Sequence, residues 1–88
     1  MNDTPNFCRA LGKVVREHRE KRKWPRKRLA EAVGVSVSHI RVIETRLGNP
    51  SISIFVLIAE AFGLEPDILM HEVRQRQAFL NHKDRVEE

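Results

Sequence analysis

The sequence predicts an all-α fold of five helices in one small domain, and three observations support this. Apolar residues recur at the three- and four-residue spacing of one helix face. The 88 residues include only 4 glycines and 4 prolines, so little of the chain is obliged to form loops. Serine, glycine and proline stand where helices would begin or end. We expect the domain to span residues 1–80, and residues 81–88 to form a frayed tail.

The first helix is expected over Phe7–Lys23, after a loose end that includes Pro5. Its apolar face contains Phe7, Leu11, Val14, Val15 and His18. We interpret His18 as a core-edge residue, because no cysteine or histidine stands at metal-ligand spacing to it. Gly12 should weaken the helix slightly. The pair Trp24-Pro25 ends it, since the residue before a proline disfavours the α conformation.

Two short helices on either side of Gly34 form the centre of the chain. The first covers Arg26–Val33, and Gly34 supplies the positive φ of a sharp turn. Val35 should fill the inside of that turn, and Ser36 should cap the next helix, Val37–Thr45. We expect Ile40 and Ile43 to form the buried face of this helix. Two helices and a tight turn of this kind form a helix-turn-helix unit, whose second helix can lie in the DNA major groove.

The fourth helix is expected over about Ile52–Phe62, capped by Ser51 and ended by Gly63. It is apolar on nearly every side, which a small monomer cannot easily bury. We therefore expect a homodimer interface, formed with the fifth helix, that includes Ile54, Leu57 and Ala61. The alternative is that these side chains all pack within one chain.

The fifth helix should open at Glu65-Pro66-Asp67 and continue to about Leu80. Its apolar stripe is expected to contain Ile68, Leu69, Val73 and either Phe79 or Leu80.

The net charge of +4 is unevenly distributed along the chain. Residues 1–48 carry 12 Lys and Arg against 5 Asp and Glu, whereas residues 49–88 carry 4 against 7. A basic front half favours a polyanionic partner, although solvated surface cations would give the same count. The run Arg26-Lys27-Arg28 sets cations at the positive end of a helix dipole. We expect a DNA phosphate to compensate it there, the alternative being a merely solvated basic turn.

Other classes of protein find little support in the sequence. Cys8 is the one cysteine, which rules out an internal disulfide and fits a reducing cytosol. No apolar run is long enough to span a bilayer, and no N-terminal export signal is present, so we expect a cytoplasmic protein. The histidines are scattered, and no phosphate-binding loop or nucleophile triad can be assembled. We expect neither an enzyme nor a metal or cofactor site.

Several short motifs fall in one continuous frame over about residues 9–70. They are Leu11-Gly12, Arg16, Arg19, Arg22, Leu29-Ala30-Glu31, Gly34-Val35-Ser36, Ser38, Ile40, Ile43-Glu44, Asn49-Pro50-Ser51, Leu57, Ala59, Ala61 and Gly63. This frame resembles the Cro/phage-repressor-like helix-turn-helix family, also called the XRE family. The resemblance implies a five-helix, phage-repressor-like DNA-binding domain whose second and third helices form the helix-turn-helix. It also implies a structural salt bridge between Arg19 and Glu44.

The resemblance implies a base-reading face on the third helix. By position, it assigns base contacts to Val37, Ser38 and Val42. From its chemistry, His39 should hydrogen-bond base edges beside Ser38, and Arg41 should reach a guanine or a phosphate. Neither valine offers a hydrogen bond, although Val37 could touch a thymine methyl. Much of the specificity should therefore come from few contacts together with DNA shape.

The resemblance also implies contacts with the DNA backbone. By position, Arg26 and Thr45 contact phosphates, with Arg26 in the place of the family's usual glutamine. We expect the neighbouring cations Lys27 and Arg46 to join them. Pro25 replaces the usual Ser or Thr cap, so the side-chain hydrogen bond of that cap is absent.

These features predict a sequence-specific transcriptional regulator of repressor or controller type. Its expected partners are double-stranded DNA with a near-palindromic operator and a second copy of the chain. The alternative is an antitoxin that neutralises a partner toxin and autoregulates its operon. A toxin gene beside this one would favour the antitoxin, and a restriction–modification operon would favour a controller.

Overall fold

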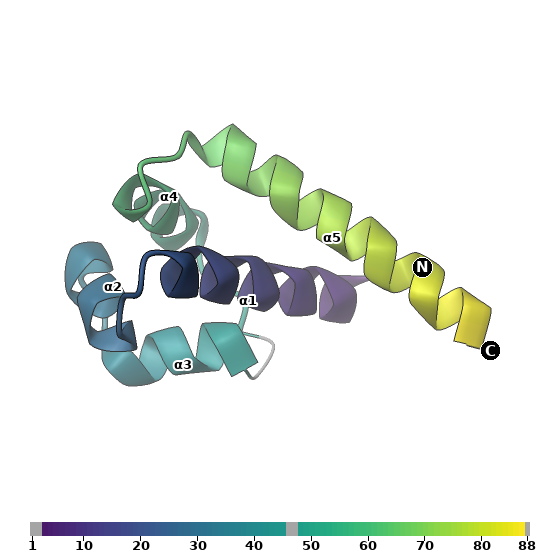
Figure 1. Cartoon of the computed structure of the whole chain (residues 1–88), viewed down its shortest axis with the longest axis horizontal. Helices are drawn as coiled ribbons and strands as arrows, with labels where there is room; N and C mark the ends of the chain where they lie inside the picture. The colour runs from purple at the N-terminus through teal and green to yellow at the C-terminus, as the bar shows by residue number, and fades with distance from the viewer. Residues whose placement is uncertain (1–2, 46–47, 88) are drawn as a thin grey trace.

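The computed structural model describes residues 3–45 and 48–87, which form five α-helices. Their bounds are α1 Thr4–Lys21, α2 Arg26–Val33, α3 Val37–Thr45, α4 Ile52–Ala61 and α5 Pro66–Glu87. Helix α1 lies at the centre and packs against both α3 and α5 (Figure 1). Helices α2 and α4 pack on each other at one end of α1. The all-α prediction is confirmed, and the bounds of α2 and α3 are those expected from the sequence.

The core contains side chains from every helix. The largest fully buried ones are Leu11, Val15, Leu29, Ile40, Ile43, Ile58, Leu69 and Val73. Those from α1, α3 and α5 lie on the faces that the apolar spacing predicted, and each of the eight contributes roughly 1.5–3 kcal/mol through burial. Cys8, on the first turns of α1, is buried as well.

The turn and caps of the helix-turn-helix form as the sequence predicted. Gly34 ends α2 with φ +88°, a left-handed conformation that favours glycine. The backbone N–H of His39 donates to Ser36 Oγ at 3.0 Å, which caps α3. Ser51 caps α4 in the same way, accepting from the backbone N–H of Ile54 at 3.2 Å.

Gly12 has a larger role than the slight weakening of α1 that the sequence suggests. A Cβ at this position would lie 2.6 Å from the carbonyl oxygen of Ile43 and 2.9 Å from that of Glu44. The missing side chain therefore lets the backbones of α1 and α3 approach closely. This contact sets the position of α3 on the rest of the fold.

The expected end of the last helix near Leu80 is wrong, because α5 continues to Glu87. Residues 81–87 are therefore helical and not the frayed tail expected from their charge. Polar side chains supply the reason. Asn81 Nδ2 donates to Asp3 Oδ2 at 2.8 Å, and Asn6 Nδ2 donates to Asn81 Oδ1 at 2.7 Å. These hydrogen bonds attach the helix to the start of α1 beyond the apolar core.

The buried stripe of α5 also differs from the expected one. Leu69 and Val73 are buried as predicted, but Ile68 and Phe79 are exposed. The next core position is taken by Gln77, which is buried and donates to Asp3 Oδ2 at 2.8 Å. A periodicity count that admits only apolar residues misses this position.

Candidate nucleic-acid interface

The outward face of α3 carries all five of the predicted base-reading residues. Val37, Ser38, His39, Arg41 and Val42 are all exposed. The helix holds them outward because Ile40 and Ile43 on its other face are buried in the core. Val37, Ser38 and Val42 have short side chains, which do not keep another surface away from the helix.

His39 lies beside a hollow that the sequence did not reveal. The hollow has a volume of about 480 Å³ and lies between α3 and the start of α4. Its lining includes Ser38, His39 and Val42 from α3, with Asn49, Pro50 and Ser51 from the connection to α4. The connection thus extends the candidate surface beyond α3. The motif Asn49-Pro50-Ser51 is visible in the sequence, but its position beside His39 depends on how the chain turns after α3.

Two of the predicted phosphate contacts remain open to solvent. Lys27 is exposed, and Thr45 is exposed although its Oγ1 donates to the carbonyl oxygen of Arg41 at 2.7 Å. That bond uses the single hydroxyl proton of Thr45, so the hydroxyl must turn away from Arg41 before it can donate to a phosphate, which only accepts. Arg46, the fourth predicted contact, lies outside the described residues.

Arg19 and Glu44 form an ion pair between α1 and α3. Arg19 Nε donates to Glu44 Oε2 at 2.7 Å, and Arg19 Nη2 donates to Oε1 at 2.9 Å. The carboxylate is fully buried, and its hydrogen bond with Arg19 raises the pKa of that guanidinium. A two-pronged pair of this kind fixes both the distance and the orientation of the two helices.

Arg26 is also bonded to Glu44, which was not expected. Its Nε donates to Glu44 Oε1 at 3.0 Å. Arg28, further along α2, lies over the Trp24 ring at 4.6 Å from the centroid. The chain itself therefore supplies part of the compensation that was expected from a phosphate. Among the described residues, no partner is found for Lys27 of this basic turn.

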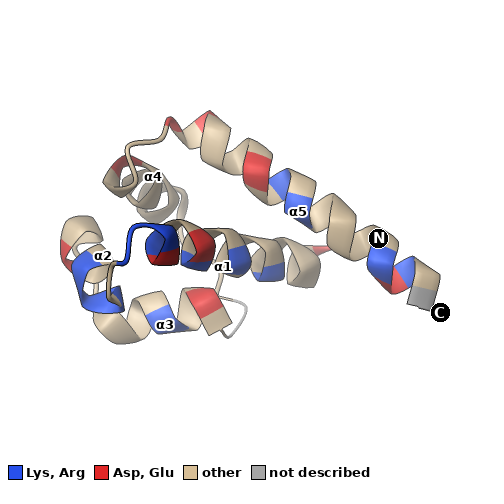
Figure 2. Ribbon diagram, in the orientation of Figure 1, with Lys and Arg blue, Asp and Glu red and all other residues tan. Residues whose placement is uncertain are grey.

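Cationic residues gather where α1 connects to α2. Lys and Arg cover the α1–α2 connection and the first turn of α2 (Figure 2). In the same view α3, which carries Arg41, lies directly below α1. Basic groups near an exposed helix face form a surface suited to a groove in DNA.

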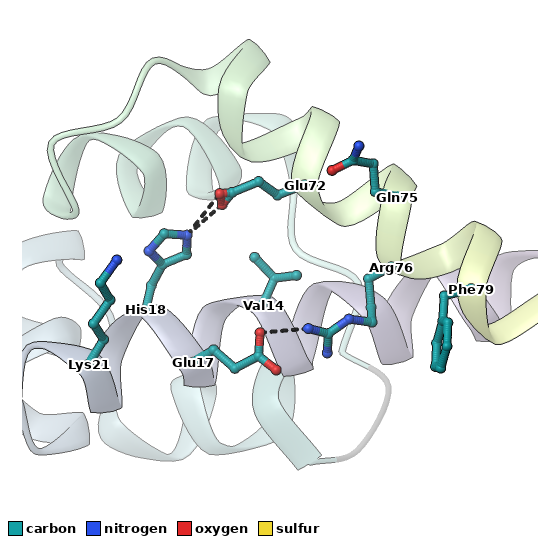
Figure 3. A pocket seen from close by; sticks show the side chains of 8 residues that line it. All are labelled: Val14, Glu17, His18, Lys21, Glu72, Gln75, Arg76 and Phe79. Atoms are coloured by element: carbon teal, nitrogen blue, oxygen red, sulfur yellow. Dashed lines mark hydrogen bonds and ion pairs between the residues drawn. The ribbon is translucent and has the colours of Figure 1, made fainter.

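A second hollow lies between α1 and α5, and contacts across it join the two helices (Figure 3). It has a volume of about 530 Å³ and is crossed by two polar contacts. Arg76 Nη2 donates to Glu17 Oε1 at 2.8 Å, and His18 Nε2 lies 2.6 Å from Glu72 Oε1. The His18 ring also stacks on Phe62 at 5.2 Å between centroids. His18 is therefore the core-edge residue that the sequence indicated.

The fold and this surface define a helix-turn-helix DNA-binding protein. Residues 15–69 match the family described as Helix-turn-helix, and the chain belongs to it, in the Cro/phage-repressor-like (XRE) group. The members of this family are DNA-binding regulators and not enzymes. Comparison with curated proteins found no match.

Two solved structures are similar to this chain. One is the restriction-modification controller protein C.AhdI from Aeromonas hydrophila, which is 26% identical with a TM-score of 0.66. That match covers 70% of this chain and 94% of the controller. The other is the clp gene regulator ClgR from Corynebacterium glutamicum, at 21% identity and a TM-score of 0.82. It covers 91% of this chain and 85% of ClgR, and it shows the fold alone.

Neither a metal site nor a membrane-spanning helix is found in the described residues. Within 3–45 and 48–87, no three His, Cys, Asp or Glu side chains are grouped so that they could hold a metal ion. None of the helices in these ranges combines the length and the apolar character needed to cross a membrane.

Proposed function

We propose that the protein is a sequence-specific transcriptional regulator that acts in the cytoplasm and binds a near-palindromic operator as a homodimer. The observation that carries this proposal is the exposed face of α3 beside the basic first turn of α2. The similarity to a restriction-modification controller protein supports a regulator of controller type.

In this proposal α3 enters the major groove and α2 contacts the DNA backbone. Ser38 and His39 hydrogen-bond base edges, Arg41 reaches a guanine or a phosphate, and Val37 and Val42 contact the apolar edges of bases. Arg26, Lys27, Thr45 and Arg46 bind phosphates and fix the register of α3 on the duplex.

A dimer would place two recognition helices in successive major grooves, about 34 Å apart. The proposed interface is formed by α4 and the start of α5. Ile54, Leu57 and Ala61 share one side of α4, because they follow the i, i+3, i+7 spacing. Leu57 is 40% exposed, whereas Ile54 and Ala61 pack partly against the core. An exposed Ile68 at the start of α5 adds apolar surface.

The test is a selection of bound sites from random duplex DNA, followed by titration of the selected and scrambled sequences. The proposal requires a near-palindromic selected site that binds at least 100-fold more tightly than its scrambled form, given a usual specificity ratio of roughly 10³ or more. Equal affinity for both would exclude sequence-specific regulation.

The second candidate function is binding to a partner protein, as an antitoxin binds its toxin. The exposed Phe79 and Val86 on α5 favour it, because large apolar side chains on a helix surface are suited to protein contacts. Co-purification with the product of a neighbouring gene would support this function. Loss of that partner on Phe79→Glu, with DNA binding intact, would locate the contact on α5.

A further inference from the structure

Glu44 accepts hydrogen bonds from two arginines, Arg19 and Arg26. The two differ in how many of their nitrogens have a hydrogen-bond partner among the described residues. Arg19 uses all three of its nitrogens, since its Nη1 donates to the Trp24 carbonyl oxygen at 2.8 Å in addition to the two bonds to Glu44. Arg26 uses Nε, at 3.0 Å from Glu44 Oε1. Among the described residues, no partner is found for Arg26 Nη1 or Nη2.

The arginine with fewer hydrogen-bonded nitrogens is also the more exposed of the two. The Arg19 side chain is 11% exposed, that of Arg26 is 27% exposed, and Glu44 between them is fully buried. Arg19 is therefore enclosed in the fold, whereas Arg26 is held at one edge and reaches the surface with the other. A guanidinium is planar, so fixing Nε also fixes the plane that contains both Nη groups.

We propose that Glu44 is a positioning residue for DNA binding: it holds Arg26 through Nε and so presents the Nη1–Nη2 edge to a single DNA phosphate. This inference rests on the proposed function and deepens it. The free edge of the guanidinium carries the parallel N–H donors that match two phosphate oxygens. One carboxylate shared between two guanidinium groups leaves one positive charge, and that charge is available to the phosphate.

The arrangement links the backbone contact to the base-reading helix. Glu44 lies in the last turn of α3, and Arg26 is the first residue of α2. The phosphate at Arg26 is therefore set at a fixed position relative to the outward face of α3. Lysine at position 26 would keep the charge but not this geometry, because its ammonium is a single point charge that the buried carboxylate would attract.

The first test replaces Arg26 by lysine and measures DNA affinity over a range of salt concentrations. We expect Arg26→Lys to raise Kd roughly tenfold, and to reduce the slope of log K against log salt by about one, as for the removal of a single phosphate interaction. The matched control is Arg76→Lys in the pair with Glu17, on the far side of α1 from α3. The Arg76 side chain is 31% exposed, close to that of Arg26, and its replacement should change neither quantity.

The second test is a cycle of Arg26→Ala, Glu44→Gln and the double variant, each checked for native circular dichroism. Glu44→Gln should weaken DNA binding and lower the salt slope in the wild-type background, and should do neither in the Arg26→Ala background. Equal weakening in both backgrounds would mean that Glu44 acts on the fold alone. Tighter binding by Glu44→Gln would mean that the carboxylate competes with the phosphate.

Either of those results overturns the inference, as does wild-type affinity and slope for Arg26→Lys. If Glu44→Gln does not fold, the comparison of Arg26→Lys with Arg76→Lys decides the question. Failure of the proposed function has a different signature: the wild-type protein itself would then bind the selected and scrambled duplexes equally, or bind neither.

Discussion

Gly12 of α1 lies directly against the backbone of Ile43 in α3, where a Cβ would be 2.6 Å from the Ile43 carbonyl oxygen. Gly12→Ala must therefore push α1 and α3 apart or strain both helices. We expect it to lower the free energy of unfolding by about 2 kcal/mol or more, although alanine is the better helix former. Denaturant unfolding would measure this decrease.

Two other substitutions separate this contact from ordinary backbone effects. Gly34→Ala places a side chain at φ +88° with no atom within 4 Å, so it should cost only about 1–2 kcal/mol. Lys13→Ala, at the exposed position next to Gly12, should lie within about 0.5 kcal/mol of wild type. A Gly12→Ala protein as stable as Lys13→Ala would contradict the proposed packing role.

The contrast between Gly12 and Gly34 shows what the sequence can predict. Gly34 stands between two recognisable helices, so its positive φ follows from local pattern. Gly12 stands inside a helix, and its importance depends on α3, which is distant in the sequence. Local spacing and capping predicted the bounds of α2 and α3 and the outward face of α3. Contacts between distant segments were harder to predict.

The same reasoning explains why the sequence predicted neither the full length of α5 nor the hydrogen bond between Arg26 and Glu44. Gln77 and Asn81 are polar, so their spacing on α5 does not indicate a buried face. Their inward position depends on their hydrogen bonds to Asp3, which is distant in the sequence. The Arg26–Glu44 bond was also hidden, because the resemblance assigned Glu44 a partner already. The sequence did contain one indication of this bond. Glu44 is the single carboxylate of α3, and a carboxylate that becomes buried requires cations beside it, which α2 supplies.

The base-reading face can be separated from the backbone contacts by the way in which affinity falls. Ser38→Ala combined with Arg41→Ala should reduce discrimination between the selected and scrambled sites by roughly 1–3 kcal/mol for each base-specific interaction that is removed. Lys27→Ala should instead weaken all duplexes alike and lower the salt slope by about one. Fluorescence anisotropy with both duplexes at several salt concentrations would measure both effects. An unchanged sequence preference in the Ser38/Arg41 variant would show that the reading face lies elsewhere.

Dimerisation through α4 can be tested by placing a charge on the proposed interface. Leu57→Glu should convert a dimer into a monomer, because an unpaired carboxylate would be buried between the two copies. Sedimentation at micromolar concentration measures the mass. Ile52→Glu is the matched control: Ile52 is 77% exposed at the first turn of α4 and lies outside the stripe formed by Ile54, Leu57 and Ala61. An unchanged mass for Leu57→Glu would refute this interface.

The burial of Cys8 makes a prediction about thiol chemistry and pH. Burial raises the pKa of the Cys8 thiol above its ordinary value of 9.0, because desolvation disfavours the thiolate. The native protein at pH 8 should therefore react with Ellman's reagent at least ten times more slowly than the protein in guanidinium chloride. Since the chain has one cysteine, the denatured sample gives the full reference value.

The sign of the linked stability follows from the same shift. A thiol whose pKa is raised in the folded state contributes stability below about pH 9, and this contribution disappears as the pH rises through the folded pKa. Cys8→Ala removes that titration. The stability difference between wild type and Cys8→Ala should therefore shrink as the pH rises above about 9, as measured by denaturant unfolding. A constant difference over that range, with rapid native labelling, would show that the Cys8 thiol is accessible to solvent.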